Sequence, residues 1–137
     1  LLNSKHLDLR RQIDVEAWMK KNKPDIIFLA AAKVGGIFAN DKYPVEFIED
    51  NLLISLNVIR SSYLNKVKKL VFLGSSCIYP KNSEQPITEN LILSGALEPT
   101  NQWYALAKIS GMKICEAYRK QFGCNHQCGS SISKDQM

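Results

Sequence analysis

Lys69-Leu-Val-Phe-Leu-Gly-Ser-Ser-Cys-Ile-Tyr-Pro80 is the stretch that decides the fold of this 137-residue chain. Residues 70–74 form an apolar run followed by hydroxyl-bearing side chains, which predicts a buried parallel strand ending at a polar site. Upstream, Asp25-Ile-Ile-Phe-Leu-Ala-Ala-Ala32 is a second apolar run bounded by breakers. It predicts another parallel strand, covered on both faces.

Helical periodicity appears before, between and after these runs. Residues 13–22 predict a short amphipathic helix with Ile13, Ala17 and Trp18 facing inward. Residues 45–64 and 103–122 predict two long helices, and the wide apolar surface of the first implies burial on two sides. The order helix, strand, helix, strand, helix predicts an α/β fold with a doubly wound, Rossmann-like parallel sheet.

The net charge of +5 does not indicate a nucleic-acid-binding protein. The basic residues are scattered among acids, and the one tight cluster, Lys66, Lys68 and Lys69, is best interpreted as a solvated helix end. No run approaches the ~18 apolar residues of a membrane span. We therefore expect neither a nucleic acid nor a membrane as partner.

The four cysteines at positions 77, 115, 124 and 128 are too few and too irregular for a disulfide framework. Cys124, His126 and Cys128 lie close together in the sequence, but three potential ligands without a fourth make a weak zinc site. We expect no metal.

Tyr104 and Lys108 stand four residues apart, which places them on one face of the predicted helix. A lysine held near a tyrosine favours the phenolate, so we expect the tyrosine pKa to fall from its ordinary value of ~10 towards the range useful for acid–base chemistry. This pair and the hydroxyls after Leu73 predict one active site.

The chain resembles the extended short-chain dehydrogenase/reductases that modify nucleotide sugars. The match rests on Leu29-Ala-Ala-Ala-Lys-Val-Gly-Gly-Ile37, Gly74-Ser-Ser-Cys-Ile-Tyr-Pro80, and Leu97-Glu-Pro-Thr-Asn101 with Tyr104 and Lys108 after it, and it covers roughly residues 7–123. Within this group it is most similar to the enzymes that epimerise and reduce GDP-4-keto-6-deoxy-D-mannose to GDP-L-fucose.

The resemblance implies four catalytic residues. Tyr104 donates a proton to the C4 carbonyl oxygen, Lys108 binds the nicotinamide ribose, and Ser75 hydrogen-bonds the same carbonyl oxygen. Cys77 acts as an acid or base in the epimerisation at C3 and C5. If the chain stays extended after Ser75, both side chains point the same way.

The resemblance also implies a nicotinamide cofactor, NADP, with NAD as an alternative. The residues expected to contact it are Asp8, Leu9, Ala30, Ala31, Ala32, Leu73, Gly74, Ser75, Ser76 and Lys108. The family's arginine for the 2′-phosphate falls at Ser4, beside Lys5, which weakens the preference for NADP.

Further expectations concern the extent of the domain. No glycine-rich phosphate turn is present, so the resemblance implies that the first strands lie upstream and the substrate-binding part downstream. Residues 1–123 then form a partial NAD(P)-binding domain, and residues 124–137 a disordered tail outside the family pattern. We also expect a cytoplasmic homodimer that uses helices 45–64 and 103–122.

Other classes stay open on the sequence. A UDP-sugar 4-epimerase or a dehydratase of the same superfamily would keep Tyr104 and Lys108, although Cys77 favours the epimerase-reductase. A fold of this type also occurs in non-catalytic proteins, and a catalytically inactive fragment would have only a structural role.

Overall fold

The structure is a computed structural model that describes residues 7–83 and 86–129. Its elements are α1 (Gln12–Asn22), β1 (Ile26–Leu29), α2 (Ile37–Lys42), α3 (Pro44–Leu64), β2 (Lys69–Leu73), η1 (Ser76–Ile78), η2 (Glu89–Leu91), α4 (Gln102–Phe122) and β3 (His126–Gly129). The predicted phosphate-binding position, Ser4, lies outside the described residues, as do residues 130–137.

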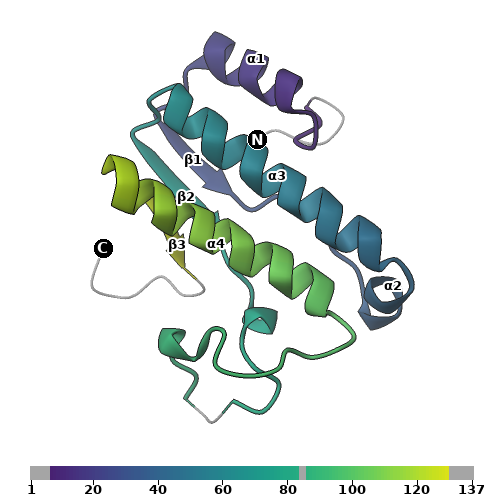
Figure 1. Cartoon of the computed structure of the whole chain (residues 1–137). Helices are drawn as coiled ribbons and strands as arrows, with labels where there is room; N and C mark the ends of the chain where they lie inside the picture. The colour runs from purple at the N-terminus through teal and green to yellow at the C-terminus, as the bar shows by residue number, and fades with distance from the viewer. Residues whose placement is uncertain (1–6, 84–85, 130–137) are drawn as a thin grey trace.

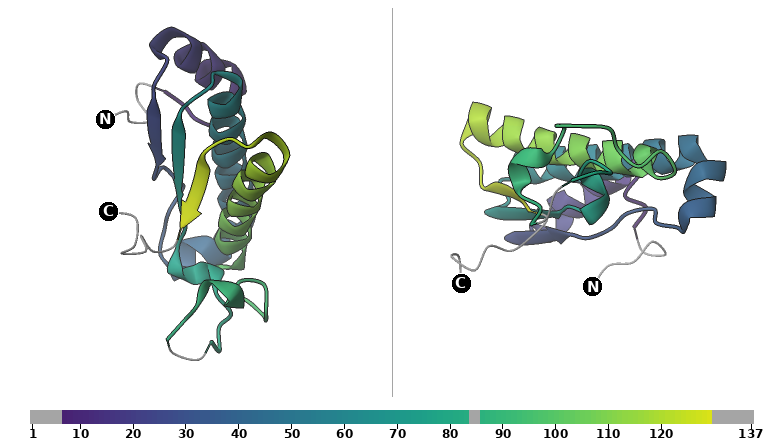
Figure 2. Two further views of the ribbon diagram at one scale, coloured as in Figure 1. Left: turned by 90° about the vertical axis from the view of Figure 1, so that its left-hand side faces the viewer. Right: turned by 90° about the horizontal axis from the view of Figure 1, so that it is seen from below.

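The sheet has the order β1-β2-β3, and both neighbouring pairs are parallel. The predicted α/β fold class is thereby confirmed. Helix α3 joins β1 to β2, and α4 joins β2 to β3. Because both connections advance across the sheet in the same direction and such crossovers share one hand, both helices lie on the same face (Figures 1 and 2).

The first strand differs from the prediction in length and in coverage. It ends at Leu29 instead of residue 32, and it is not covered on both faces, since Ile26 is 53% and Phe28 70% exposed. The chain leaves the sheet after Leu29, and the backbone of Lys33 bonds to the Asn51 side chain on α3.

The hydrophobic core lies between the sheet and the helices. It contains Val15, Met19, Leu29, Val58, Ile59, Leu70, Phe72 and Cys115. The predicted inward face of α1 is correct for Trp18, which packs against this core, and wrong for Ala17 and for Ile13, which is 71% exposed. Val15 and Met19 enter the core instead. Two faces of this short helix carry apolar side chains, and packing against α3 and β1 selects one of them.

A glycine allows α4 to approach the sheet closely. A Cβ atom built on Gly111 would lie 2.5 Å from Cζ of the buried Phe72. The inner face of α3 is mixed, because Val58 and Ile59 enter the core while two buried serines bond within the helix. Ser55 donates to Asn51 O and Ser62 to Val58 O, each at 2.7 Å.

The predicted disorder from residue 124 onward is wrong for residues 126–129, which form β3. Leu70 N donates to Asn125 O and Gly74 N to Gly129 O, both at 3.0 Å. The backbone groups of β2 need partners whatever the neighbouring side chains are, so a polar segment can complete the ladder. His126 is fully buried in this strand, with its ring 5.7 Å from that of Tyr118.

No helix within residues 7–83 and 86–129 is long and apolar enough to cross a membrane.

Candidate active site

The end of β2 presents the first two reactive side chains. Ser75 is still extended, but Ser76–Ile78 form a single 3-10 turn, so the condition of an extended chain after Ser75 is not met. The turn nevertheless brings the two groups together, because Cys77 Sγ donates a hydrogen bond to Ser75 Oγ at 3.2 Å. The Ser75 hydroxyl and the Cys77 thiol are therefore direct neighbours at the end of β2.

The first turn of α4 supplies the third reactive side chain, Tyr104. It lines a cavity of about 260 Å³ together with both residues at the end of β2. The lining residues are Val34, Gly35, Asn40, Ser75, Cys77, Asn101 and Tyr104. Three of the four predicted catalytic residues thus meet in one pocket.

Lys108, one turn after Tyr104, is 4% exposed and does not line the cavity. Its ammonium donates to the carbonyl oxygen of Leu73 at 3.1 Å. The same Nζ lies 4.9 Å from the ring centre of Phe72 and 5.9 Å from that of Tyr104. Lys108 therefore ties the end of β2 to α4 and keeps its charge close to the tyrosine.

The pKa of Tyr104 is raised from its usual value, so the predicted lowering by Lys108 is not observed. Burial is the largest cause, the neighbouring Cys77 adds to it, and a hydrogen bond with Ser75 opposes it. The pKa of Lys108 is lowered, and burial is again the largest cause.

The pKa of Cys77 is also raised, chiefly by burial. Its hydrogen bond with Ser75 and the charge of Lys108 act in the opposite direction. Tyr104 and Cys77 are therefore both protonated near neutral pH, and the pocket holds two proton donors.

Sequence reasoning assigned no role to four of the lining residues: Val34, Gly35, Asn40 and Asn101. Within the described part of the chain, the Oδ1 atoms of Asn40 and Asn101 are buried without a hydrogen-bond partner. Unpaired buried acceptors are rare and suit a donor brought by a ligand. Asn101 ends the motif Leu97–Asn101, which was the available signal, whereas nothing local marked Asn40.

Seven of the ten predicted cofactor residues lie at the carboxyl ends of two paired strands. Residues 30–32 follow β1, and residues 73–76 include the end of β2, which pairs with β1 through Leu29 and Phe72. Ala30 and Ala31 are exposed, and their small side chains leave the strand end open to a ligand. This placement fits a nucleotide, because ligands of open α/β sheets bind at the carboxyl ends of strands.

The segment predicted to meet the adenine ring is ordered by its own side chains. Asp8 accepts three hydrogen bonds from Arg10, at 3.0, 2.9 and 2.8 Å, which lower its pKa to about 2. The Asn57 amide on α3 donates to the carbonyl oxygens of Leu9 and Arg10. The segment is thus fixed on the helix that also holds Lys33.

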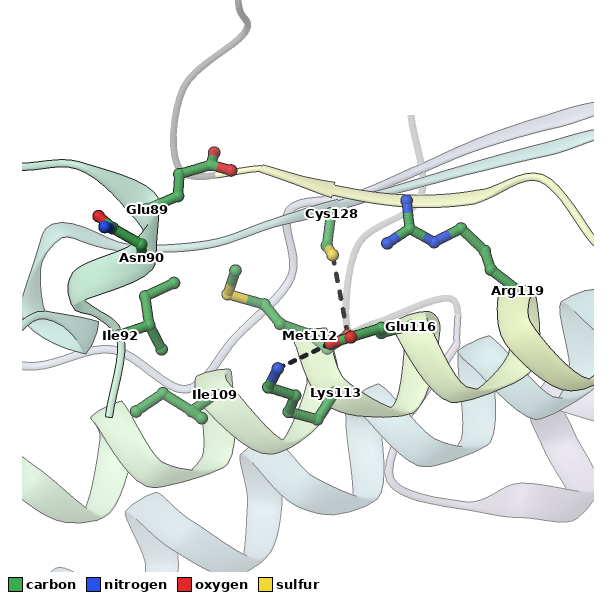
Figure 3. A pocket seen from close by; sticks show the side chains of 9 residues that line it. All are labelled: Glu89, Asn90, Ile92, Ile109, Met112, Lys113, Glu116, Arg119 and Cys128. Carbon is green, nitrogen blue, oxygen red and sulfur yellow. Dashed lines mark hydrogen bonds and ion pairs between the residues drawn. The ribbon is translucent and has the colours of Figure 1, made fainter. Parts of the chain in front are cut away.

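A larger cavity of about 380 Å³ lies between α4, β3 and the turn around η2 (Figure 3). Its lining residues are Glu89, Asn90, Ile92, Ile109, Met112, Lys113, Glu116, Arg119 and Cys128. None of the predicted catalytic residues is among them, so its size does not make it the active site. Within residues 7–83 and 86–129, no cluster of histidine, cysteine and acidic side chains could hold a metal ion.

Known proteins resemble this chain strongly. The GDP-L-fucose synthase of Sinorhizobium fredii (strain NBRC 101917 / NGR234) is 59% identical over 119 residues, 87% of this chain and 38% of that protein. The GDP-L-fucose synthase 1 of Arabidopsis thaliana is 61% identical over 117 residues, 85% of this chain and 36% of that protein. The chain thus spans little more than a third of the length of these relatives.

Solved structures give the same picture. The GDP-mannoheptose C4 reductase of Campylobacter jejuni, with NADP bound, matches 93% of this chain and 40% of that chain with a TM-score of 0.89 and 41% identity. A GDP-L-fucose synthetase from Naegleria fowleri, also bound to NADP, matches 93% and 39% with a TM-score of 0.82 and 31% identity. The sequence model of the NAD dependent epimerase/dehydratase family matches residues 2–130. The chain therefore belongs to the NAD-dependent epimerase/dehydratase family.

Proposed function

We propose that this chain carries the catalytic groups of an NADP-dependent epimerase-reductase that converts GDP-4-keto-6-deoxy-D-mannose to GDP-L-fucose. The observation that carries the proposal is the pocket shared by Ser75, Cys77 and Tyr104. It combines groups for carbonyl reduction with a thiol for proton transfer at carbon. The names of the relatives at 59% and 61% identity support the same reaction.

Tyr104 is the proposed proton donor for the reduction at C4. Its phenol gives a proton to the carbonyl oxygen, and the Ser75 hydroxyl donates a hydrogen bond to the same oxygen. The raised pKa keeps the phenol protonated and ready to donate. The nicotinamide, when bound, supplies the hydride. Lys108 has three N–H donors, of which Leu73 takes one, so others can bind the nicotinamide ribose.

Cys77 is the proposed acid/base group of the epimerisation at C3 and C5. A proton on a carbon next to a ketone can be removed because the charge moves to the carbonyl oxygen, where Ser75 and Tyr104 stabilise it. The removed proton goes to a base on the opposite face of the sugar, supplied by another part of the protein, and the protonated thiol of Cys77 then gives its own proton to the enolate carbon. One oxygen-binding site thus serves both halves of the reaction.

The cofactor proposal places the adenosine beside Asp8, Leu9 and residues 30–32, and the nicotinamide beside residues 73–76. The two solved relatives with NADP bound support NADP over NAD. We also propose a cytoplasmic homodimer through α3 and α4. Leu53 and Leu56 on α3 are 37% and 45% exposed, which leaves apolar surface for such a contact.

A full-length chimera tests the function. The 119 residues that match the Sinorhizobium fredii protein replace the corresponding part of that protein, and the chimera receives GDP-4-keto-6-deoxy-D-mannose and NADPH. We expect GDP-L-fucose as product, identified by mass spectrometry and NMR. A 4-epimer, a dehydrated sugar or an unchanged substrate would overturn the proposal, provided that the unmodified Sinorhizobium protein is active in parallel.

A further inference from the structure

The loop of residues 33–36 forms one wall of the candidate active site. Val34 and Gly35 line the cavity that also contains Ser75, Cys77 and Tyr104. Since β1 ends at Leu29, no strand within residues 7–83 and 86–129 pairs with the backbone of this loop. The position of this wall must therefore depend on contacts with side chains.

Asn51, on the inner face of α3, takes the place of a paired strand. It is 2% exposed, and its Oδ1 accepts a hydrogen bond from the amide of Lys33 at 2.8 Å. Its Nδ2 donates to the carbonyl oxygen of Lys33 at 3.0 Å and to that of Phe47, on its own helix, at 2.7 Å. One carboxamide therefore binds both polar groups of one backbone residue and anchors them to a helix.

Further contacts attach the same loop to its surroundings. The ammonium of Lys33 forms ion pairs with Glu46 and Asp50 of α3. A Cβ atom at Gly35 would lie 2.8 Å from Phe47 Cζ, so the loop rests directly on that ring. From α2, the Asn40 amide donates to Gly35 O at 2.9 Å and to Gly36 O at 3.1 Å.

We propose that Asn51 is a positioning residue of the reaction, which fixes the wall formed by Val34 and Gly35 relative to the reacting groups of Ser75 and Tyr104. The inference rests on the proposed function for its catalytic part. A displacement of about 1 Å in such a wall can lower a rate about a hundredfold, because reacting atoms lose their alignment.

The substitution Asn51→Ser separates the loop from the helix. A serine at this position can still donate to the carbonyl of residue 47, as Ser55 and Ser62 do to the carbonyls four residues before them. It is too short to reach Lys33. The matched control is Asn65→Ser, since Asn65 also donates to a carbonyl four residues earlier, Ser61 O at 2.9 Å, at the other end of α3.

Hydrogen exchange in the full 137-residue chain tests the geometry without any enzyme activity. Loss of one hydrogen bond to a neutral group corresponds to about a tenfold change, so the Lys33 amide should exchange about tenfold faster in Asn51→Ser. The exchange rate in Asn65→Ser should match the unsubstituted chain. An unchanged Lys33 amide in Asn51→Ser would overturn the inference.

Kinetics of the chimera test the catalytic role. We expect Asn51→Ser to lower kcat for GDP-L-fucose formation by about 10- to 100-fold, with circular dichroism unchanged and Asn65→Ser fully active. An equal loss in both variants, or none in Asn51→Ser, would contradict a positioning role. An inactive unsubstituted chimera would defeat the proposed function, while the exchange of the Lys33 amide would still decide whether Asn51 holds the loop.

Discussion

Burial keeps the reactive tyrosine and cysteine side chains protonated. The pKa values of Tyr104 and Cys77 are both raised chiefly by burial, and the hydrogen bond with Ser75 opposes the rise in each case. Lys108 is itself buried, and its own pKa is lowered. Near neutral pH the pocket thus contains a phenol and a thiol, two donors that share one hydroxyl partner.

Tyr104→Phe removes only the proposed proton donor. In the chimera we expect kcat for reduction to fall by about 10²- to 10⁴-fold, the usual contribution of a positioned acid. The thermal midpoint should not change, because the ring remains. Tyr118→Phe on the same helix, outside the pocket, is the control and should reduce normally. Normal turnover by Tyr104→Phe would remove this residue from the mechanism.

Cys77→Ser should impair epimerisation more than reduction. A serine hydroxyl is a far weaker acid than a thiol, so solvent deuterium exchange at C3 and C5 should slow by about 10²-fold or more in the chimera. Hydride transfer to a pre-epimerised ketone should persist, which isotope incorporation and NADPH absorbance measure separately. Equal losses in the two steps would mean that Cys77 acts through structure alone.

His126 is a fully buried imidazole. Within the described residues, neither of its ring nitrogens has a hydrogen bond, and burial lowers its pKa below the usual 6.5. The folded chain therefore binds fewer protons than the unfolded chain as pH falls below 6.5. Its contribution to stability is present above that pH and is lost as pH decreases through the lowered pKa.

His126→Ile should raise the free energy of unfolding at pH 7 by about 1–3 kcal/mol, since it removes an unpaired polar group and suits a strand. It should also flatten the loss of stability below pH 6.5, measured by urea unfolding at several pH values. The chain has two histidines, so His6→Ile serves as the control. A steeper acid dependence in His126→Ile would contradict this account.

At the scale of elements, the contact between α4 and the sheet depends on a missing side chain. Gly111 faces the ring of Phe72, which is 1% exposed and surrounded by the core. The inner face of α3 also carries small side chains among its core residues, with Ser55 and Ser62 bonded within the helix. Gly111 on α4 and the two serines on α3 are small residues, which allows both helices to pack closely on the rest of the chain.

Gly111→Ala should destabilise the chain by about 1–3 kcal/mol, because the added methyl group forces a shift in a filled core. Gly36→Ala is the control: no atom lies within 4 Å of a Cβ built there. Denaturant midpoints of the two variants give the comparison. If both variants have the same denaturant midpoint, the close approach of α4 to Phe72 does not limit the size of the residue at position 111.

At the scale of the whole molecule, the helices of residues 7–83 and 86–129 cover one face of the sheet and leave the other face uncovered (Figure 2). Both crossover helices lie on the same side, so Ile26 and Phe28 of β1 are exposed at 53% and 70%. Open apolar surface beside an unpaired strand edge favours association. The exposed face of β1 differs from the prediction, in which this strand is covered on both faces.

Phe28→Lys should shift the 137-residue chain towards the monomer of 15.5 kDa, measured by light scattering after size-exclusion chromatography. Phe38→Lys, an equally drastic change at a 76% exposed site on α2, should have a smaller effect because it lies off the sheet. A chain that is already monomeric before substitution would contradict this prediction.

The sequence by itself determined the parallel α/β class and the long helices, which begin one residue before their predicted starts and end where predicted. It also indicated that Ser75 and Tyr104 share a site. These features follow from periodicity and from the rule that the carboxyl ends of parallel strands meet at one edge. Periodicity depends on residues close together in the sequence, and the rule on strand ends depends on a single strand–helix–strand connection.

Only the tertiary structure decided the rest. The pocket wall depends on a hydrogen bond between Lys33 and Asn51, which are eighteen positions apart. No local sequence pattern predicts this bond. The direction of the Tyr104 pKa shift depends on how much water the packed neighbours remove, and burial outweighs the nearby ammonium. Residues 126–129 form a strand because the backbone groups of β2 require hydrogen-bond partners. The pattern of side chains in the sequence does not show this requirement.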